Sequence, residues 1–205
     1  MSTNTLMGAA EIVVRRLKPE LLDDYLRFFD KDAFTDFPYW SGCYCGFYET
    51  SGEEWDATAK AGPAHRAAKA ERISSGKALG LLAYVDDKVV GWCNAQLRSN
   101  FVNMRRYSVA INNPDERVGS IMCFLVAPNY RRIGVCTALV NAACEMFRSL
   151  SLEAAEGYPT TSPAKSSWEV PWAEENYKGP LSIFLNNGFK IHRQLERFAI
   201  VRKQL

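Results

Sequence analysis

Two arginines and a glycine near the middle of the chain stand between a predicted strand and a predicted helix. The apolar run over 121–127 indicates a buried strand, and apolar residues that repeat on one face over 136–150 indicate a helix. The first N–H groups of a helix have no internal partner, and the helix dipole favours an anion there. Arg131 and Arg132 would add positive charge, and Gly134 would let a ligand approach the backbone closely. The pattern therefore predicts a phosphate site at the helix N-terminus.

The composition narrows the class of protein. With 205 residues and 47% apolar residues, the chain is long and apolar enough for one packed domain. A net charge of +2 with both signs spread along the chain argues against a nucleic-acid surface. No run is long enough for a membrane span and no leader pattern is visible, so we expect a cytoplasmic protein with no membrane partner. Its six cysteines are then expected to be free thiols.

Hydrophobic periodicity predicts an α/β (α+β) chain in which residues 1–10 are flexible and 11–205 form one domain. The predicted strands cover 11–17, 79–85, 89–97, 121–127, 152–158 and, as one long strand or a pair, 189–202. The predicted helices cover 20–29, a stretch over 53–74 interrupted at Gly62-Pro63, 136–150 and 181–186.

The central segment resembles motif A of the GCN5-related N-acetyltransferases (GNAT), R/Q-x-x-G-x-G/A. It reads Arg131-x-x-Gly134-x-Cys136, so a cysteine stands where the family usually has Gly or Ala. Two weaker resemblances lie in the expected order, the D-x-x-x-G hairpin at 87–91 and the G-F pair at 188–189. The resemblance implies the GNAT fold, a mixed and mostly antiparallel sheet split in a V and flanked by helices.

Within the family the chain is similar to a poorly characterised subgroup that carries Cys-x-Cys, V-G-W-C, C-F-x-V and E-x-Y-P segments. The matching segments are Cys43-Tyr44-Cys45, Val90-Gly91-Trp92-Cys93, Cys123-Phe124-Leu125-Val126 and Glu156-Gly157-Tyr158-Pro159.

The resemblance implies acetyl-CoA as the cofactor. In the family the turn wraps the pyrophosphate, and the strand before it binds the pantetheine arm and polarises the thioester carbonyl, here with the N–H of Val126 as our first choice. An Asn commonly opens the last helical segment in relatives, so Asn176 is expected to hold the pantetheine. The expected cofactor residues are Phe124, Leu125, Val126, Arg131, Arg132, Ile133, Gly134, Val135, Cys136, Thr137 and Asn176.

The acid that protonates the leaving thiolate is left open by the sequence. Family members often have a tyrosine five residues before the Phe of the G-F pair, but this chain has Phe184 there, which has no proton to donate. Tyr177, solvent or the Cys123 thiol are the alternatives.

The base is equally open, and Glu156 is the first choice because it lies at the end of a predicted strand beside the split. The other carboxylates near predicted strand ends or in the acceptor segment are Asp36, Glu53, Glu54 and Asp56. His65 and His192 have no obvious nucleophile beside them and are expected to be structural or surface residues.

The Cys-x-Cys segment could contribute two ligands to a metal, but no second Cys/His pair has suitable spacing, so we expect no metal site. If the segment is a strand, Cys43 and Cys45 point the same way and line an apolar acceptor pocket or pack in the core. The expected pocket draws on the aromatic residues of 34–48 and on a 159–175 loop with Trp168 and Trp172. Its named residues are Trp40, Cys43, Cys45 and Trp92.

We therefore predict an acetyl-CoA-dependent N-acetyltransferase that acetylates the primary amine of a small molecule or a peptide by direct attack. Two alternative functions remain on the same fold: a non-catalytic acyl-CoA-binding or sensing domain, and a structural partner subunit that has lost cofactor binding. The absence of a tyrosine at 184 and the presence of Cys136 favour the first rival, and the intact Arg131, Arg132 and Gly134 argue against the second. A homodimer is compatible with the family resemblance.

Overall fold

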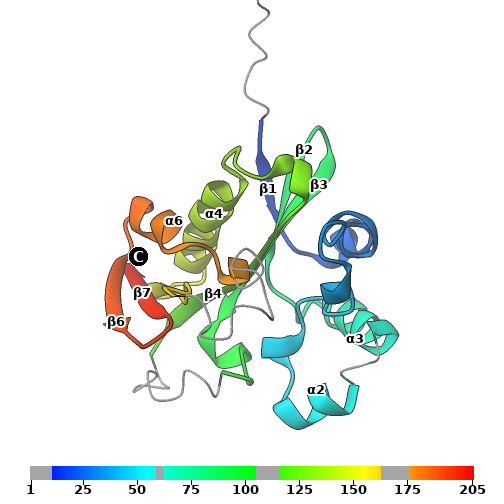
Figure 1. Ribbon diagram of the computed structural model, residues 1–205, viewed down its shortest axis with the longest axis horizontal. Coiled ribbons are helices and arrows are strands. Elements are labelled where there is room, and N and C mark those ends of the chain that lie inside the picture. Colours follow the sequence, from blue (N-terminus) through cyan, green and yellow to red (C-terminus); the bar gives the residue numbers. More distant parts are fainter. Residues whose placement is uncertain (1–10, 59–61, 105–115, 163–175) are drawn as a thin grey trace, which may run out of the picture.

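A computed structural model describes residues 11–58, 62–104, 116–162 and 176–205. At its centre is one seven-stranded sheet in the order β1-β2-β3-β4-β5-β7-β6 (Figure 1). Neighbouring strands run antiparallel except β4 and β5, which are parallel. The strands are β1 (Val13–Arg16), β2 (Leu81–Val85), β3 (Lys88–Leu97), β4 (Val118–Val126), β5 (Ala154–Gly157), β6 (Lys190–Gln194) and β7 (Ala199–Gln204).

Helices cover both faces of this sheet (Figure 1). The α-helices are α1 (Leu22–Arg27), α2 (Gly52–Thr58), α3 (Gly62–Ser74), α4 (Val135–Ser149) and α6 (Leu181–Asn186). The short helical turns are η1 (Pro19–Leu21), the π-helical η2 (Phe28–Asp32), η3 (Pro38–Trp40), η4 (Phe47–Glu49), η5 (Arg98–Asn100), η7 (Pro128–Tyr130) and η8 (Asn176–Lys178).

The face covered by α4 holds the larger apolar core. One side of α4 buries Leu139, Val140 and Phe147 completely against the strands, as its apolar repeat predicts. Gly119 on β4 allows the helix to come close, because a Cβ atom there would overlap the Phe147 ring. The helix is therefore fixed at a short distance from the middle of the sheet.

The opposite face is covered by α1, η2 and α3, with an aromatic core under them. Trp92 on β3 is fully buried there, with its ring edge-on to Tyr25 at a centroid distance of 4.9 Å. The Trp92 ring also fills the space beside Gly80, where no Cβ atom would fit. Trp92 is thus a core residue, which corrects its expected place in the lining of an acceptor pocket.

The expected fold class is confirmed, and the differences from the sequence expectations concern boundaries and local conformation. β4 begins at Val118, three residues earlier than expected, and the last predicted strand region is a pair, β6 and β7. Cys43 and Cys45 lie in turns between η3 and η4 and not in a strand. Cys45 has a φ of +51°, so the assumption that both thiols project from one strand face is wrong. Trp168 and Trp172 lie outside the described residues.

Candidate functional site

The sheet opens along one edge of β4. β4 pairs with β3 over residues 119–126, but it pairs with β5 only over residues 118–121. Met122 has no partner in the β3 register, because Asn94 faces Cys123 and the next β3 residue faces Ile121, so β4 carries a β-bulge at this point. From Met122 onward, β4 therefore has one edge that β5 does not cover. This divergence is the V-shaped split that the fold predicts.

The polar groups of this open edge can be assigned from the hydrogen bonds of its neighbours. The Ala127 N–H donates to the Val90 carbonyl at 2.9 Å, so it faces β3. Peptide groups alternate along a strand, which turns the N–H groups of Val126 and Phe124 toward the open edge. The Val126 carbonyl also points to this edge, because it accepts a hydrogen bond at 3.1 Å from the Arg131 side chain and not from β3. An extended amide-containing ligand would find backbone partners here.

The open edge leads into the glycine-containing turn. After η7 the chain passes through Arg132, with a φ of +67°, and Gly134, with a φ of +100°, before α4 begins at Val135. The Ala138 N–H makes the first helical bond, to the Gly134 carbonyl at 3.0 Å. The N–H groups of 135–137 precede that bond and have no acceptor within the helix. Their position makes them suitable donors for an anion beside the exposed turn.

Cys136, the departure from the family motif, remains compatible with an anion at this site. Burial raises the pKa of its thiol to about 11, so the side chain is neutral at pH 7. A thiolate at this position would have repelled a phosphate, whereas a neutral thiol acts as a small apolar group.

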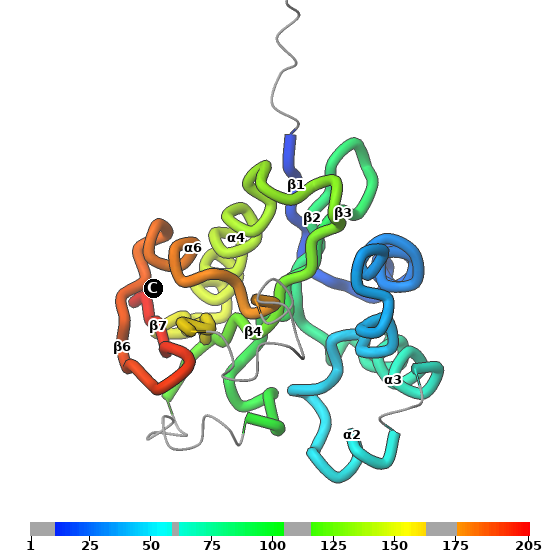
Figure 2. The backbone as a smooth tube through the Cα atoms, viewed as in Figure 1, coloured from blue at the N-terminus to red at the C-terminus, as the bar shows by residue number. Residues whose placement is uncertain are grey.

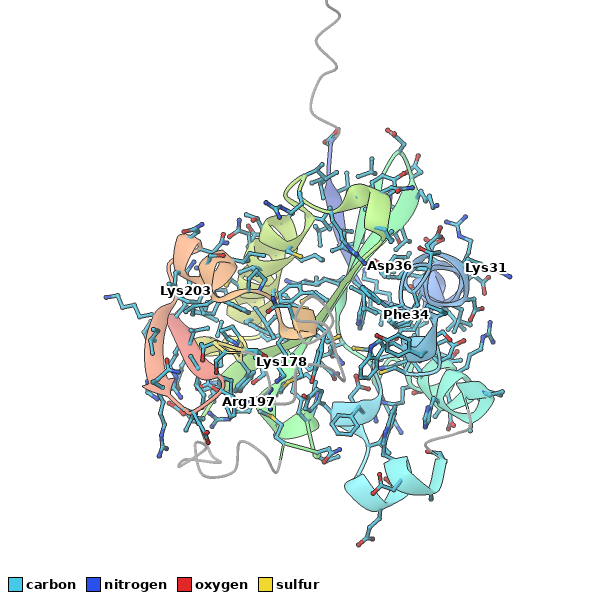
Figure 3. The ribbon with its side chains drawn as sticks, in the orientation of Figure 1. Lys31, Phe34, Asp36, Lys178, Arg197 and Lys203 are labelled. Carbon is cyan, nitrogen blue, oxygen red and sulfur yellow. The ribbon has the colours of Figure 1, made fainter. Side chains whose placement is uncertain are left out.

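Arg131 is oriented differently from what the motif suggests. Its guanidinium donates to both carboxylate oxygens of Asp36, at 2.5 and 3.2 Å, while its Nε donates to the Val126 carbonyl. Asp36 lies in the segment between η2 and η3 and is labelled in Figure 3. One side chain thus ties the end of β4, the turn and the opposite face together. Arg132 is exposed as well, and it has no ion pair within the described residues.

The segment η8 lies across the open part of β4, in orange in Figure 2. Gly179 packs on β4, because a Cβ atom there would lie 2.9 Å from the Phe124 ring. Asn176 has a buried Oδ1 atom with no hydrogen-bond partner in the part of the chain that the structure describes. A buried acceptor of this kind is suited to the amide N–H groups of a pantetheine arm.

Tyr177 is placed beside the stretch of β4 that follows the bulge. It packs against two buried clusters, one that includes Cys123 and one that includes Met122. Its hydroxyl lies 2.8 Å from the Tyr48 hydroxyl. Tyr177 therefore stands next to the split.

Phe184, at the family's usual tyrosine position, is fully buried. Its ring packs edge-on to Phe124 and Phe189, at centroid distances of 6.1 and 5.3 Å, and fills the space beside Gly157. It is a core residue under the sheet.

Glu156, the first choice for the base, is buried on β5 in a network of ion pairs. It accepts bonds from Arg202 at 2.5 Å, from Arg98 at 3.4 Å and from the Tyr158 hydroxyl at 2.8 Å. Glu116 joins the same two arginines. A buried carboxylate whose oxygens are bonded to two guanidinium groups and a phenol has little access to an amine, which suits a structural role better than that of a base.

The remaining predicted catalytic residues are dispersed. The Cys123 thiol is buried beside Cys45, and both the hydrogen bond to Cys45 and burial raise its pKa well above the usual value, so it is a poor thiolate source. Glu53, Glu54 and Asp56 lie exposed on α2, and Glu54 accepts a bond from the Ser51 hydroxyl. They do not converge with Tyr177.

Both histidines agree with the expectation of structural or surface roles. His65 is buried, stacked on Trp55 at 4.0 Å, with its ring nitrogens at 2.8 Å from the Thr58 hydroxyl and 2.9 Å from the Gly42 carbonyl. His192 is exposed on β6.

The expected acceptor pocket is only partly assembled. Trp40 is 41% exposed on the surface near Tyr39, whereas Cys45 is buried beside β3, where Asn94 donates to its carbonyl at 3.1 Å. Sequence reasoning placed Tyr48 only among the aromatic residues of the expected pocket and gave Glu49 no role. The signal available for the latter was a pair of polar residues, Asn94 and Gln96, at alternate positions of an otherwise apolar strand.

The described residues contain no group of three or more His, Cys, Asp or Glu residues that could hold a metal ion. Within the same ranges no helix is both long and apolar enough to cross a membrane.

Solved structures with the same fold are numerous, although their sequences have diverged. PaiA N-acetyltransferase from Thermoplasma acidophilum, in complex with coenzyme A, is 16% identical, with a TM-score of 0.54 over 95% of this chain and 99% of that one. The polyamine N-acetyltransferase of Drosophila melanogaster is 12% identical, with a TM-score of 0.55 over 95% of this chain and 100% of that one. A GNAT-family acetyltransferase from Listeria monocytogenes is 13% identical, with a TM-score of 0.53 over 97% of each chain.

No curated protein sequence matches the chain. The model of the acetyltransferase (GNAT) family matches residues 46–161, more than half of the sequence, and these residues contain the open edge of β4, the turn and α4. The match and the architecture agree. The exposed turn, the first N–H groups of α4 and the Asn176 Oδ1 atom, which has no partner among the described residues, suit the cofactor on which this family relies, acetyl-CoA. The chain belongs to the acetyltransferase (GNAT) family.

Proposed function

We propose that this enzyme transfers the acetyl group of acetyl-CoA to a primary amine of a small molecule or a peptide, by direct attack of the amine on the thioester. The observation that carries the proposal is the continuity of the open edge of β4 with the anion site of α4. A ligand with a pantetheine arm joined to a pyrophosphate matches this continuity, because it needs amide partners along one stretch and anion partners at its end.

Each part of the cofactor would have its own protein partners. The N–H groups of 135–137 and the Arg132 side chain would hold the pyrophosphate, with the Thr137 hydroxyl beside them. Asn176 and the edge of β4 would hold the pantetheine amides. The N–H of Val126 faces the split and would donate to the thioester carbonyl oxygen, which gains negative charge as the amine attacks.

Tyr177 is our candidate for the acid that protonates the departing thiolate. It is the tyrosine of η8, the segment that lies across β4 at the split, whereas Phe184 has no ionisable group and Cys123 is buried beside Cys45. We assign removal of the amine proton to water in the split. We do not propose Glu156 as the base, because its carboxylate is buried and its oxygens are bonded to Arg98 and Arg202.

We also propose that the protein is located in the cytoplasm. All six cysteines are free, which fits a reducing environment such as the cytoplasm.

Binding can be tested first, by thermal unfolding with acetyl-CoA and with free CoA as a control. A ligand present at about 100 times its dissociation constant stabilises the fold by about 2.7 kcal/mol, which corresponds to a rise of roughly 5–10 °C in the midpoint. No rise at millimolar acetyl-CoA would contradict the assigned site.

Catalysis is tested by following the release of free CoA thiol with a panel of primary amines, each matched to its N,N-dimethyl counterpart. We expect release with primary amines only, because a tertiary amine cannot form a stable amide. Binding without amine-dependent release by any of the amines would favour the acyl-CoA-sensing alternative, which the loss of the usual tyrosine at position 184 motivates.

A further inference from the structure

A second tyrosine reaches the split from a segment distant in sequence. The Tyr48 hydroxyl lies 2.8 Å from the Tyr177 hydroxyl, and the two residues are 129 positions apart. Tyr48 is 4% exposed and belongs to a buried cluster that includes Met122, the residue of the β4 bulge. The pair thus lies beside the place where β4 and β5 separate.

The position of Tyr48 is fixed by the residue that follows it. The Glu49 carboxylate, almost fully buried, accepts bonds from Lys69 at 2.6 Å, Asn94 at 2.8 Å and Gln96 at 2.7 Å. Asn94 and Gln96 are on β3, the strand next to β4. The Tyr48 carbonyl also accepts a bond at 3.1 Å from the Asn103 N–H. The η4 turn is therefore attached to the centre of the sheet, and the hydroxyl of Tyr48 has a defined place.

We propose that Tyr48 is a positioning residue for the leaving-group acid, which orients the Tyr177 hydroxyl and donates a hydrogen bond to its oxygen as the proton leaves. The proposal rests on the proposed acetyl transfer, in which the bond from the amine nitrogen to the acetyl carbon forms and the carbon–sulfur bond breaks. The Tyr177 O–H proton passes to the CoA sulfur, and its electron pair stays on the phenolic oxygen. A hydroxyl can rotate from acceptor to donor, so Tyr48 can follow this change of charge.

The surroundings of the pair favour this direction of transfer. The Lys178 ammonium lies 5.3 Å from the centre of the Tyr177 ring, so a positive charge is near the phenolate that would form. Two neighbouring groups stay neutral, because burial raises the pKa of Tyr158 and the contact with Cys45 raises that of Cys123. The Glu49 charge next to Tyr48 is paired with Lys69.

A purely structural link between η4 and η8 would give the same distance, so the test has to measure the proton. Tyrosine labelled with ¹³C at Cζ reports each phenol titration by NMR, and Tyr177→Phe identifies the signal of Tyr177. The titration is run on the full chain saturated with free CoA and needs no knowledge of the acceptor. The variants are Tyr48→Phe and, as a matched control, Tyr25→Phe, which removes a buried hydroxyl bonded at 2.8 Å to the Tyr44 carbonyl.

In Tyr48→Phe we expect the pKa of Tyr177 to rise by about one unit or more, since a donor to the phenolate is lost. In Tyr25→Phe it should remain at the wild-type value. With the best amine of the panel, kcat should fall about 10-fold in Tyr48→Phe, and Tyr177→Phe should lower it further, by about 100-fold. The alkaline limb of the kcat profile should move to higher pH in Tyr48→Phe and disappear in Tyr177→Phe.

An unchanged Tyr177 titration in a folded Tyr48→Phe protein would overturn the inference and leave the proposed function intact. Failure of the proposed function is recognised separately, since the wild-type protein would then release no CoA with any amine, and the inference would fall with it. Thermal unfolding of Tyr48→Phe and Tyr25→Phe shows whether both variants are folded to the same extent.

Discussion

At the scale of single residues, Gly134 is required by its backbone conformation and not by a lack of space for a side chain. A Cβ atom at Gly134 would have room, because its nearest neighbour is the Ile12 Cδ1 atom at 3.9 Å. The φ of +100° is what disfavours other residues. Substitution therefore introduces backbone strain at a solvent-exposed position without disturbing the core.

For Gly134→Glu we expect a loss of about 1–2 kcal/mol in stability and at least a 100-fold loss of acetyl-CoA affinity, because a carboxylate would meet the pyrophosphate. Calorimetric titration measures the affinity. Gly76→Glu is the matched control, since Gly76 has a φ of +70° and open space around it but lies at the end of α3. It should lose similar stability and keep its affinity. Wild-type affinity in Gly134→Glu would disprove the phosphate site.

The two arginines of the turn should differ in their contributions. Arg132 is exposed beside the proposed anion site, whereas Arg131 is already paired with Asp36. We therefore expect Arg132→Gln to weaken acetyl-CoA binding about 3- to 10-fold, and Arg131→Gln to weaken it less. Calorimetric titration of both variants with acetyl-CoA measures the two affinities. The opposite order would mean that the Arg131–Asp36 pair opens when the cofactor binds.

The partner of Arg131 illustrates what the sequence could and could not predict at this scale. The motif correctly identified the turn, because a turn and a helix start are local features of sequence. The Asp36 contact spans 95 positions and depends on how the η2–η3 segment folds back over β4, which no local pattern encodes. The ion network around Glu156 could not be predicted for the same reason, since its arginine partners come from β7 and from η5.

At the scale of secondary-structure elements, two glycines set the distance between α4 and the sheet at its two ends. A Cβ atom at Gly91 on β3 would lie 2.7 Å from the Val135 Cγ1 atom, at the first residue of α4. A Cβ atom at Gly119 would overlap the Phe147 ring, near the last turn of the same helix. Each glycine therefore permits the close approach of a different end of the helix.

Gly91→Ala and Gly119→Ala should each destabilise the protein by about 1–3 kcal/mol, because both overpack a core contact. Only Gly91→Ala should also weaken acetyl-CoA binding several-fold, since it displaces the N–H groups that form the anion site. Chemical denaturation and calorimetric titration give the two quantities. Equal affinities in the two variants would argue that the position of the α4 N-terminus does not limit binding.

The spacing of apolar residues along the sequence predicted the main helices and strands, such as α4 and the β2–β3 hairpin. It predicted the 43–45 segment poorly, because cysteine and aromatic residues suit both a strand and a buried turn. The left-handed conformations of Tyr44 and Cys45, with φ of +41° and +51°, are uncommon for residues of these types. Local propensity could not have indicated them.

At the scale of the whole molecule, ion pairs join elements that are distant in sequence, and they make stability depend on pH. The hydrogen bond from Arg202 lowers the pKa of Glu116, and the hydrogen bond from Arg66 lowers that of Asp30. A carboxyl with a lowered folded-state pKa contributes stability above its unfolded value of about 4 and loses it as pH falls through the folded value.

The unfolding midpoint should therefore be nearly constant between about pH 7 and pH 5 and should fall below about pH 4. Arg202→Gln should have a lower midpoint at pH 7, by roughly 5–10 °C, because it leaves Glu156 and Glu116 short of a partner. Its further decline in acid should be shallower than that of the wild type. Equal acid slopes for the two proteins would show that the Arg202 network does not govern the decline.

The short pairing of β4 with β5 has a further consequence for the protein without its cofactor. Five residues of β4 present an uncovered edge inside the sheet, and such an edge is a template on which a strand of another chain can add. The bulge at Met122 distorts that edge, as natural proteins often do to discourage such pairing. Acetyl-CoA bound along this edge would cover it and would reduce aggregation. A concentrated sample without cofactor should therefore scatter more light than a sample saturated with acetyl-CoA.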